Sequence, residues 1–298
     1  MSKPDNNSHI TNHESRITNH VSRIPFIDFG GEGPLLHFAH ANAYPPHCYR
    51  QFLELLTPHF HVVALEQRPL WPDSDPAELT DWQLLSEDMI RLFDEQGWRQ
   101  VIGVGHSMGA VATMKAAVTR PDLFRTLVMV EPVFLLPALL EMAATHPDAA
   151  YQMPLVQSAL RRRRQFESRE YAFERWRRKP VFARWPDESL WDYVNYALIP
   201  DTENGGFRLA YPREWEARIY ARPPQWVWDM LLQVMQLTLG IRGAETDTIA
   251  PEAWQLWQEK QPQAEFVEMA DAGHMLLMER PSAAAQIILD YLKVYNPR

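Results

Sequence analysis

The sequence predicts an α/β fold, with a mostly parallel central sheet, helices on both faces and one inserted helical cap. Apolar runs typical of strands alternate with helical stretches before residue 133 and again after residue 233. Between them, about a hundred residues rich in Arg, Trp and Pro contain no clear strand. Because such alternation produces parallel sheets, we expect a core of residues 24–132 plus 234–298 and a cap of residues 133–233.

The N-terminal residues 1–23 differ from this pattern. The heptad ITNHESR at 10–16 is followed at once by ITNHVSR at 17–23. Their apolar content is too low to offset the entropy lost on ordering. We therefore expect a disordered or partner-ordered extension.

The first part of the core reads as alternating elements in chain order. The strands are expected in RIPFIDF, PLLHFAHA, HVVALEQ, RQVIGVG and RTLVMVEP. The helices are expected in HCYRQFLELL, in the amphipathic stretch TDWQLLSEDMIRLFDEQG that Gly97 ends, and in SMGAVATMKAAVTR before Pro121. After the cap, the alternation returns with the strand MQLTLGIRG, the helix PEAWQLWQEKQ, the strand AEFVEM and the helix PSAAAQIILDYL.

Composition restricts the class of protein. The 298 residues carry a net charge of −9, which argues against a nucleic-acid binder. A single cysteine, Cys48, excludes an internal disulfide and favours a reducing compartment. No apolar run of about 18 residues and no signal-peptide pattern occurs, so we expect a cytoplasmic protein without stable membrane insertion. The oligomeric state is open.

The most informative motif is G-x-S-x-G at residues 105–109, between an expected strand and an expected helix. This pattern is typical of a nucleophile elbow, in which a sharp turn holds the serine hydroxyl out from the backbone. Gly105 and Gly109 keep the crowded turn free of side chains, so Ser107 can project from it. The N–H group of Met108 would lie at the helix N-terminus, where it could stabilise an oxyanion.

The sequence GHSMG after VIGV resembles the elbow of the α/β-hydrolase superfamily. The resemblance implies an acid and a histidine base that follow the serine in chain order. The stretches LGIRGAETDTIAP and EMADAGHMLLMERP resemble the acid loop and the histidine loop of that family.

These two loops suggest the remaining catalytic residues. We assign His274 as the general base and Asp247 as the carboxylate that orients it. Glu245 is a competing acid two positions before Asp247. Asp271 lies within the histidine loop itself, where a cap or turn role fits better.

The second oxyanion donor is expected in HFAHANAYPPHCY. His40 matches the histidine that the family usually carries there, and Ala41 replaces the usual glycine. The backbone N–H of Asn42 would be the donor, while its side chain either contacts substrate or caps a turn. The Gly-rich loop that many relatives carry after the next strand is replaced by LEQRPLWPDSDP, which leaves the subfamily open.

No cofactor and no metal ion are predicted. His37 and His40 are three residues apart on an expected strand, so their side chains face opposite sides of the sheet. Core or supporting roles suit them better than a shared ion.

The cap contains an unusual basic stretch at residues 161–184, in which nine Arg and one Lys face three Glu, a net charge of 10 − 3 = +7. It could recognise an acidic substrate or a membrane surface. We favour a solvated helical face whose arginines pair with the acidic core. A few aromatic residues of the cap are expected to line an apolar pocket.

Together these features predict a serine hydrolase that cleaves small-molecule carboxylic esters through an acyl-enzyme. A C–C bond hydrolase or an acyltransferase could use the same residues, since the fold alone does not select the bond. A non-catalytic binding module is a further, weaker alternative.

Overall fold

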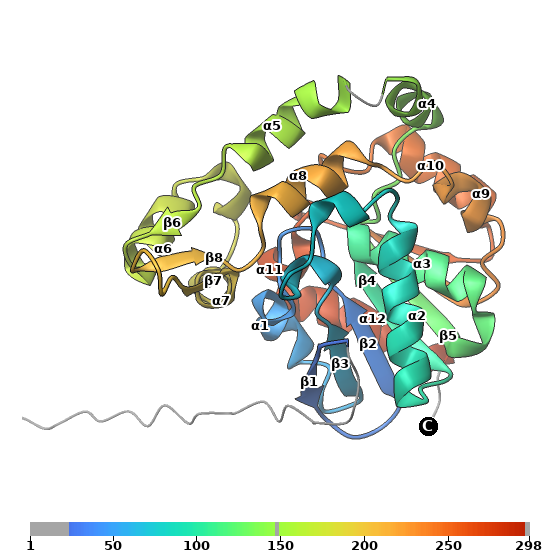
Figure 1. Ribbon diagram of the computed structural model, residues 1–298. Coiled ribbons are helices and arrows are strands. Elements are labelled where there is room, and N and C mark those ends of the chain that lie inside the picture. Colours follow the sequence, from blue (N-terminus) through green and yellow to red (C-terminus); the bar gives the residue numbers. More distant parts are fainter. Residues whose placement is uncertain (1–23, 147–148, 296–298) are drawn as a thin grey trace, which may run out of the picture.

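The computed structural model describes residues 24–146 and 149–295 (Figure 1). The predicted N-terminal extension, residues 1–23, lies outside the described residues. In the described part, each helix falls short of the length and apolar character that a bilayer crossing requires.

A twisted central sheet of seven described strands carries the core, in the order β1-β3-β2-β4-β5-β9-β10. Only the edge strand β1 is antiparallel to its neighbour β3, whereas the other pairs are parallel. The predicted mostly parallel sheet is therefore confirmed. The strands are β1 (Phe26–Gly30), β2 (Leu35–Ala39), β3 (His61–Leu65), β4 (Val101–His106), β5 (Phe124–Val130), β9 (Leu237–Gly243) and β10 (Glu265–Met269).

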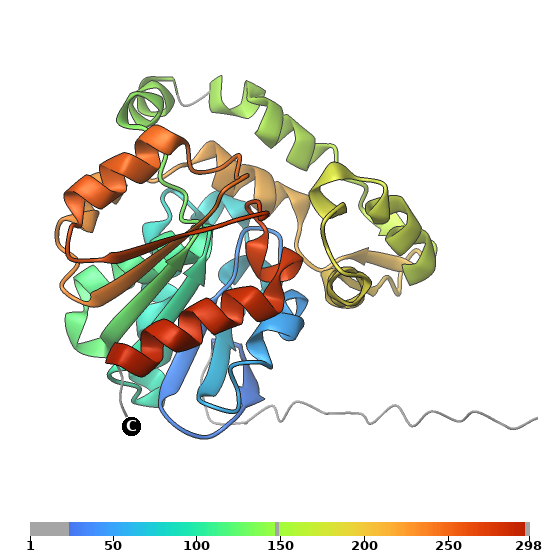
Figure 2. The same ribbon diagram turned by 180° about the vertical axis from the view of Figure 1, so that it is seen from behind.

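Helices cover both faces of this sheet, as expected from the alternation (Figures 1 and 2). The short α1, α11 and the long α12 pack on one face, while α2, α3 and α10 pack on the other. Strand β4 is buried along its whole length because it lies between two strands and under helices on both sides. These helices are α1 (Arg50–Leu53), α2 (Gln83–Gln96), α3 (Met108–Thr119), α10 (Pro251–Lys260), α11 (Leu276–Glu279) and α12 (Pro281–Tyr295).

The inserted segment, residues 133–233, connects β5 to β9 and lies over the carboxyl ends of the parallel strands (Figure 1). It is not purely helical, which corrects the prediction, because β6, β8 and β7 form a small antiparallel sheet. These strands are only two or three residues long, too short to leave a pattern in the sequence. Its elements are α4 (Pro137–Thr145), α5 (Pro154–Leu160), β6 (Gln165–Phe166), α6 (Arg169–Arg177), α7 (Asp187–Ala197), β7 (Leu198–Pro200), β8 (Phe207–Leu209), α8 (Arg213–Ala221) and α9 (Val227–Leu231).

Candidate active site

Ser107 lies at a sharp turn between the end of β4 and the start of α3. Its backbone angles, φ 56° and ψ −120°, are ones that residues other than glycine rarely adopt. Such backbone strain is expected at a nucleophile elbow. A methyl group at Gly105 would come within 2.5 Å of the Ala110 Cα, and one at Gly109 would overlap the Ala39 carbonyl. The two glycines of the motif therefore let the turn form and let α3 approach the neighbouring strand β2.

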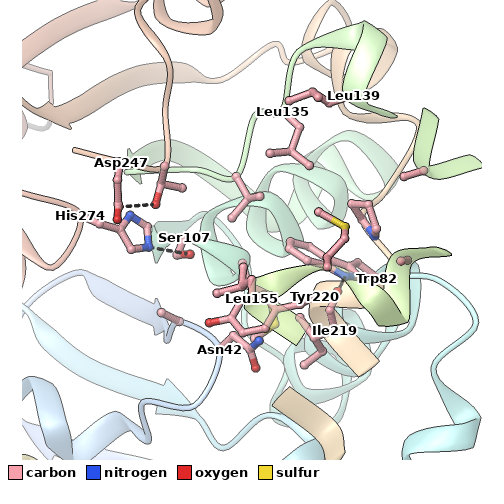
Figure 3. A pocket seen from close by; sticks show the side chains of 18 of the residues that line it. Asn42, Trp82, Ser107, Leu135, Leu139, Leu155, Ile219, Tyr220, Asp247 and His274 are labelled. Atoms are coloured by element: carbon pink, nitrogen blue, oxygen red, sulfur yellow. Dashed lines mark hydrogen bonds between the residues drawn. The ribbon is translucent and has the colours of Figure 1, made fainter. Parts of the chain in front are cut away.

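His274 lies in the loop between β10 and α11, against the serine. Its Nε2 is 3.1 Å from Oγ of Ser107 (Figure 3). Its Nδ1 is 3.0 Å from Oε2 of Glu131. The structure thus brings together Ser107 and His274, as the sequence predicted, and adds a carboxylate on the far side of the ring.

Glu131 follows the last residue of β5 directly and is completely buried. Its backbone is left-handed (φ 50°), while its N–H still donates to the Ile241 carbonyl of β9 at 2.8 Å. Oε1 accepts the N–H of Gly243 at 2.6 Å, and Oε2 accepts the hydroxyl of Thr246 at 2.5 Å. These donors offset the cost of burying the carboxylate and fix its direction toward His274.

The structure does not bring Asp247 to the position predicted for it, so that assignment is corrected. Both ring nitrogens of His274 already have partners in Glu131 and Ser107. Asp247 is exposed and accepts a 3.4 Å hydrogen bond from the Thr248 hydroxyl. The competing acid Glu245 is also exposed and pairs with Arg184 of the inserted segment.

The order of strands explains the difference. Strand β5, which ends just before Glu131, lies directly beside the elbow strand β4, with β9 on its other side. A side chain that leaves the carboxyl end of β5 therefore emerges close to Ser107. The signal missed in the sequence is the acid in VMVEP, which follows the first apolar strand after the elbow.

A buried hydrogen-bond chain, also missed in the sequence, links three loops of the site. The N–H of Ala41 donates to the Tyr49 hydroxyl at 3.1 Å, and this hydroxyl lies 2.8 Å from Nδ1 of His106. Nε2 of His106 lies 2.9 Å from the backbone carbonyl of His274. Burial holds the pKa of His106 well below its usual range. The neutral ring therefore accepts from Tyr49 and donates to the carbonyl of the histidine loop.

The loop after β2 is fixed by His40 and stays next to the elbow. Nδ1 of His40 donates to the Ala41 carbonyl at 2.8 Å, and Nε2 accepts the Gln67 N–H at 3.2 Å. Burial lowers the pKa of His40 to about 4, so the ring is neutral. The residue of this loop with a left-handed backbone is Ala43 (φ 69°). Ala41 has no positive φ, so the alanine that replaces the usual glycine there causes no backbone strain.

The side chain of Asn42 is hydrogen-bonded to two residues of the inserted segment. Its Nδ2 donates to the Glu216 carbonyl at 3.1 Å, and its Oδ1 accepts the Tyr211 hydroxyl at 2.8 Å. Both partners belong to the inserted segment, so this amide joins the two parts of the protein. Asn42 and Met108, at the start of α3, both line the cavity described below.

A cavity of about 700 Å³ lies between this site and the inserted segment. Ser107 and His274 lie at one end of it, and apolar side chains of the inserted segment form much of its wall (Figure 3). Asp247 is the one carboxylate among the described residues that line it. The apolar lining from the inserted segment consists of Val133, Leu135, Leu139, Met142, Ala143, Ala149, Ala150, Met153, Leu155, Val181, Ile219, Tyr220 and Pro223.

Comparisons with known proteins agree with this architecture. Residues 38–287 match the model of the alpha/beta hydrolase family. The abhydrolase domain-containing protein ACTT2 of Alternaria alternata is 27% identical over 228 residues, which cover 64% of this chain and 82% of that protein.

Solved structures share the fold at lower identity. E-2-(acetamidomethylene)succinate hydrolase is 19% identical with a TM-score of 0.74, and the match covers 91% of this chain and 95% of that one. The thioesterase domain from the curacin biosynthetic pathway is 21% identical with a TM-score of 0.69, over 89% and 94% of the two chains. The family match spans most of the chain, including the elbow and the histidine loop, and the protein therefore belongs to the alpha/beta hydrolase family.

Proposed function

We propose that the protein is a serine hydrolase that cleaves small carboxylic esters through an acyl-enzyme intermediate. The observation that carries this proposal is the continuous hydrogen-bond chain from Ser107 through His274 to the buried Glu131. A serine hydroxyl is a weak nucleophile unless a base accepts its proton, and the base needs an orienting group. Nε2 of His274 meets the first need, and Glu131 meets the second.

The reaction then follows from these positions. Nε2 of His274 accepts the hydroxyl proton as Oγ of Ser107 attacks the ester carbonyl. The N–H group of Met108 would stabilise the negative oxygen, because the first N–H groups of a helix have no acceptor within it. The N–H group of Asn42, in the loop after β2, would be the second donor. His274 returns the proton to the departing alkoxide. A water molecule, activated in the same way, then releases the carboxylic acid. Donors of this kind typically contribute about 10²–10³-fold in rate.

We infer that residues 24–132 and 234–298 form the catalytic core and that residues 133–233 form a cap over it. The cap supplies most of the apolar wall of the 700 Å³ cavity. A pocket of this size and character suits an apolar acyl or alcohol group. The Asn42 amide, held by Glu216 and Tyr211, supports a fixed contact between cap and oxyanion loop.

The test combines covalent labelling with an ester series. A fluorophosphonate probe should label the native protein at Ser107, and Ser107→Ala should abolish both labelling and hydrolysis of p-nitrophenyl esters of increasing chain length. Ser86→Ala is a matched control, because Ser86 is a buried serine of α2 that does not line the catalytic cavity. Failure of the native protein to label would contradict the proposal. Turnover of dienoic diketones but not of esters would favour the C–C hydrolase instead.

A further inference from the structure

The basic stretch of the inserted segment divides into two groups in the structure. Four of its arginines pair with carboxylates, which agrees with the favoured interpretation, although only one of the four partners belongs to the core. The pairs are Arg162 with Glu216, Arg164 with Glu214, Arg177 with Asp187 and Arg184 with Glu245. Within the described residues, the other six cations have no carboxylate partner, namely Arg161, Arg163, Arg169, Arg175, Arg178 and Lys179.

Four of these six cations, Arg161, Arg163, Arg175 and Lys179, line one concave site. Together with Arg162 they surround a cavity of about 210 Å³ that is separate from the catalytic cavity. Its walls come from α5, the turn after it, β6, α6 and β8, which lie together at one end of the inserted segment (Figure 1). The described residues that line it include no carboxylate. The full lining is Ser158, Arg161, Arg162, Arg163, Phe166, Arg175, Trp176, Lys179 and Leu209.

Three buried apolar side chains help to line this cavity. Phe166 and Trp176 are almost completely buried and meet edge to face at 5.1 Å, and Leu209 is buried beside them. The cations Arg161, Arg163, Arg175 and Lys179 are exposed, but the apolar side chains beside them leave water on one side only, which reduces the screening of their charges. Consistent with this, burial and then repulsion by Arg162 and Arg175 lower the pKa of Lys179. The free site therefore holds mutually repelling cations that an anion would stabilise.

We propose that this cavity is a binding site for a phosphate group, supplied either as a free anion or as part of a larger molecule. Guanidinium groups donate paired hydrogen bonds whose geometry matches phosphate oxygens, and an ammonium adds a point charge. Arg162 is held by Glu216 and by the Tyr193 hydroxyl at 2.8 Å, so it forms a fixed wall. Arg161, Arg163, Arg175 and Lys179 remain to contact the ligand. The small volume fits one or two phosphate groups rather than an extended polyanion.

The phosphate site adjoins the catalytic cavity. Leu155 and Ser158, three residues apart on one face of α5, line the catalytic and the phosphate cavity respectively. Glu216, the partner of Arg162, also offers its carbonyl to Asn42. A bound phosphate group is therefore close enough to belong to a substrate that extends from the catalytic cavity, or to affect the cap contact at the oxyanion loop.

Binding is measured independently of the proposed ester hydrolysis, on the native protein and on Ser107→Ala. Calorimetric titration with pyrophosphate at low ionic strength should show one saturable site in both proteins, and binding should weaken as salt is added. The double variant Arg163→Gln/Arg175→Gln should bind at least about tenfold more weakly, because it loses two charged donors. Arg178→Gln is the matched control, an exposed arginine at the end of α6 that lies outside the cavity.

Comparison of inorganic phosphate with phenyl phosphate distinguishes the two sources. Tighter binding of inorganic phosphate supports a free anion, and tighter binding of phenyl phosphate supports a larger phosphate-bearing ligand. In both cases the double variant should bind that ligand more weakly than the native protein does. The absence of pyrophosphate binding to the native protein would overturn the proposal. Equal binding by the native protein and a folded double variant would also overturn it. Neither result would affect the case for ester hydrolysis, which rests on other residues.

Discussion

Oε2 of Glu131 lies 3.0 Å from Nδ1 of His274, although 143 positions separate the two residues in the chain. The carboxylate is completely buried and accepts two further hydrogen bonds, from Gly243 and Thr246. It therefore has one orientation, and that orientation fixes the histidine ring for Ser107. The predictions below follow from this arrangement and from the buried groups around it.

Replacing Glu131 should have a far larger effect than replacing Asp247. The amide of Glu131→Gln lacks the charge that stabilises the protonated ring, and it can favour the wrong tautomer of His274. We expect kcat for p-nitrophenyl esters to fall by about 10³–10⁴-fold, as for the carboxylate of other triads. Asp247→Asn is the matched control and should change kcat by no more than about threefold, since Asp247 holds neither ring nitrogen. The reverse ranking of the two variants would restore Asp247 as the orienting acid.

Thr246 should influence turnover through Glu131. Thr246→Val keeps the side-chain volume but removes the hydroxyl that donates to Oε2 at 2.5 Å. We expect kcat to fall by about tenfold, the usual effect of one hydrogen bond to a charged group, with KM nearly unchanged. Thr248→Val provides the comparison, because its hydroxyl bonds to Asp247 instead. Equal kcat values for the two variants would argue against a contribution of this hydroxyl.

Tyr49 should stabilise the folded protein as well as the site. Tyr49→Phe leaves the Ala41 N–H and Nδ1 of His106 buried without their partner. We expect the free energy of unfolding in urea to fall by about 1–3 kcal/mol, and kcat to fall because the loop that carries Asn42 loses an anchor. Tyr171→Phe, at an exposed position of α6, should change neither quantity. Unchanged stability of the Tyr49 variant would show that water or another group replaces the hydroxyl.

Stability should fall as the pH is lowered below about 6.5, because buried histidines must then be protonated on unfolding. Burial, and to a lesser degree His40, lowers the pKa of His37 to about 3, and burial lowers the pKa of His40 to about 4. Between those values and the ordinary value of 6.5, the unfolded chain binds more protons than the folded one. The free energy of unfolding is therefore largest above pH 6.5 and declines toward acid.

His37→Gln tests this dependence. The side-chain oxygen of glutamine can still accept the Leu65 N–H that bonds to Nε2 of His37 at 3.2 Å, but it does not titrate. We expect the slope of unfolding free energy against pH, between about 4.5 and 6, to decrease by up to about 1.4 kcal/mol per pH unit. The difference between the two proteins at pH 8 gives the packing cost alone. Parallel curves for the native protein and the variant would contradict the assignment of acid sensitivity to His37.

The sequence by itself determined the layered α/β architecture, the elbow and the histidine. These features are local, or repeat with a fixed period. Two glycines around Ser107 act within one turn, strands and helices each carry their own apolar pattern, and His274 stands in a recognisable loop before the last helices. The interruption between residues 133 and 233 was visible for the same reason, as a loss of that pattern.

Only the tertiary structure decided which carboxylate reaches His274 and which arginines remain unpaired. Glu131 contacts the His274 ring because β5 lies between β4 and β9 in the sheet. The order of the strands in a sheet cannot be deduced from the sequence of any one strand. The short strands of the inserted segment and the basic cavity depend equally on contacts between segments far apart in the chain. Distances between side chains follow from packing over the whole molecule, whereas a sequence pattern reports only on near neighbours.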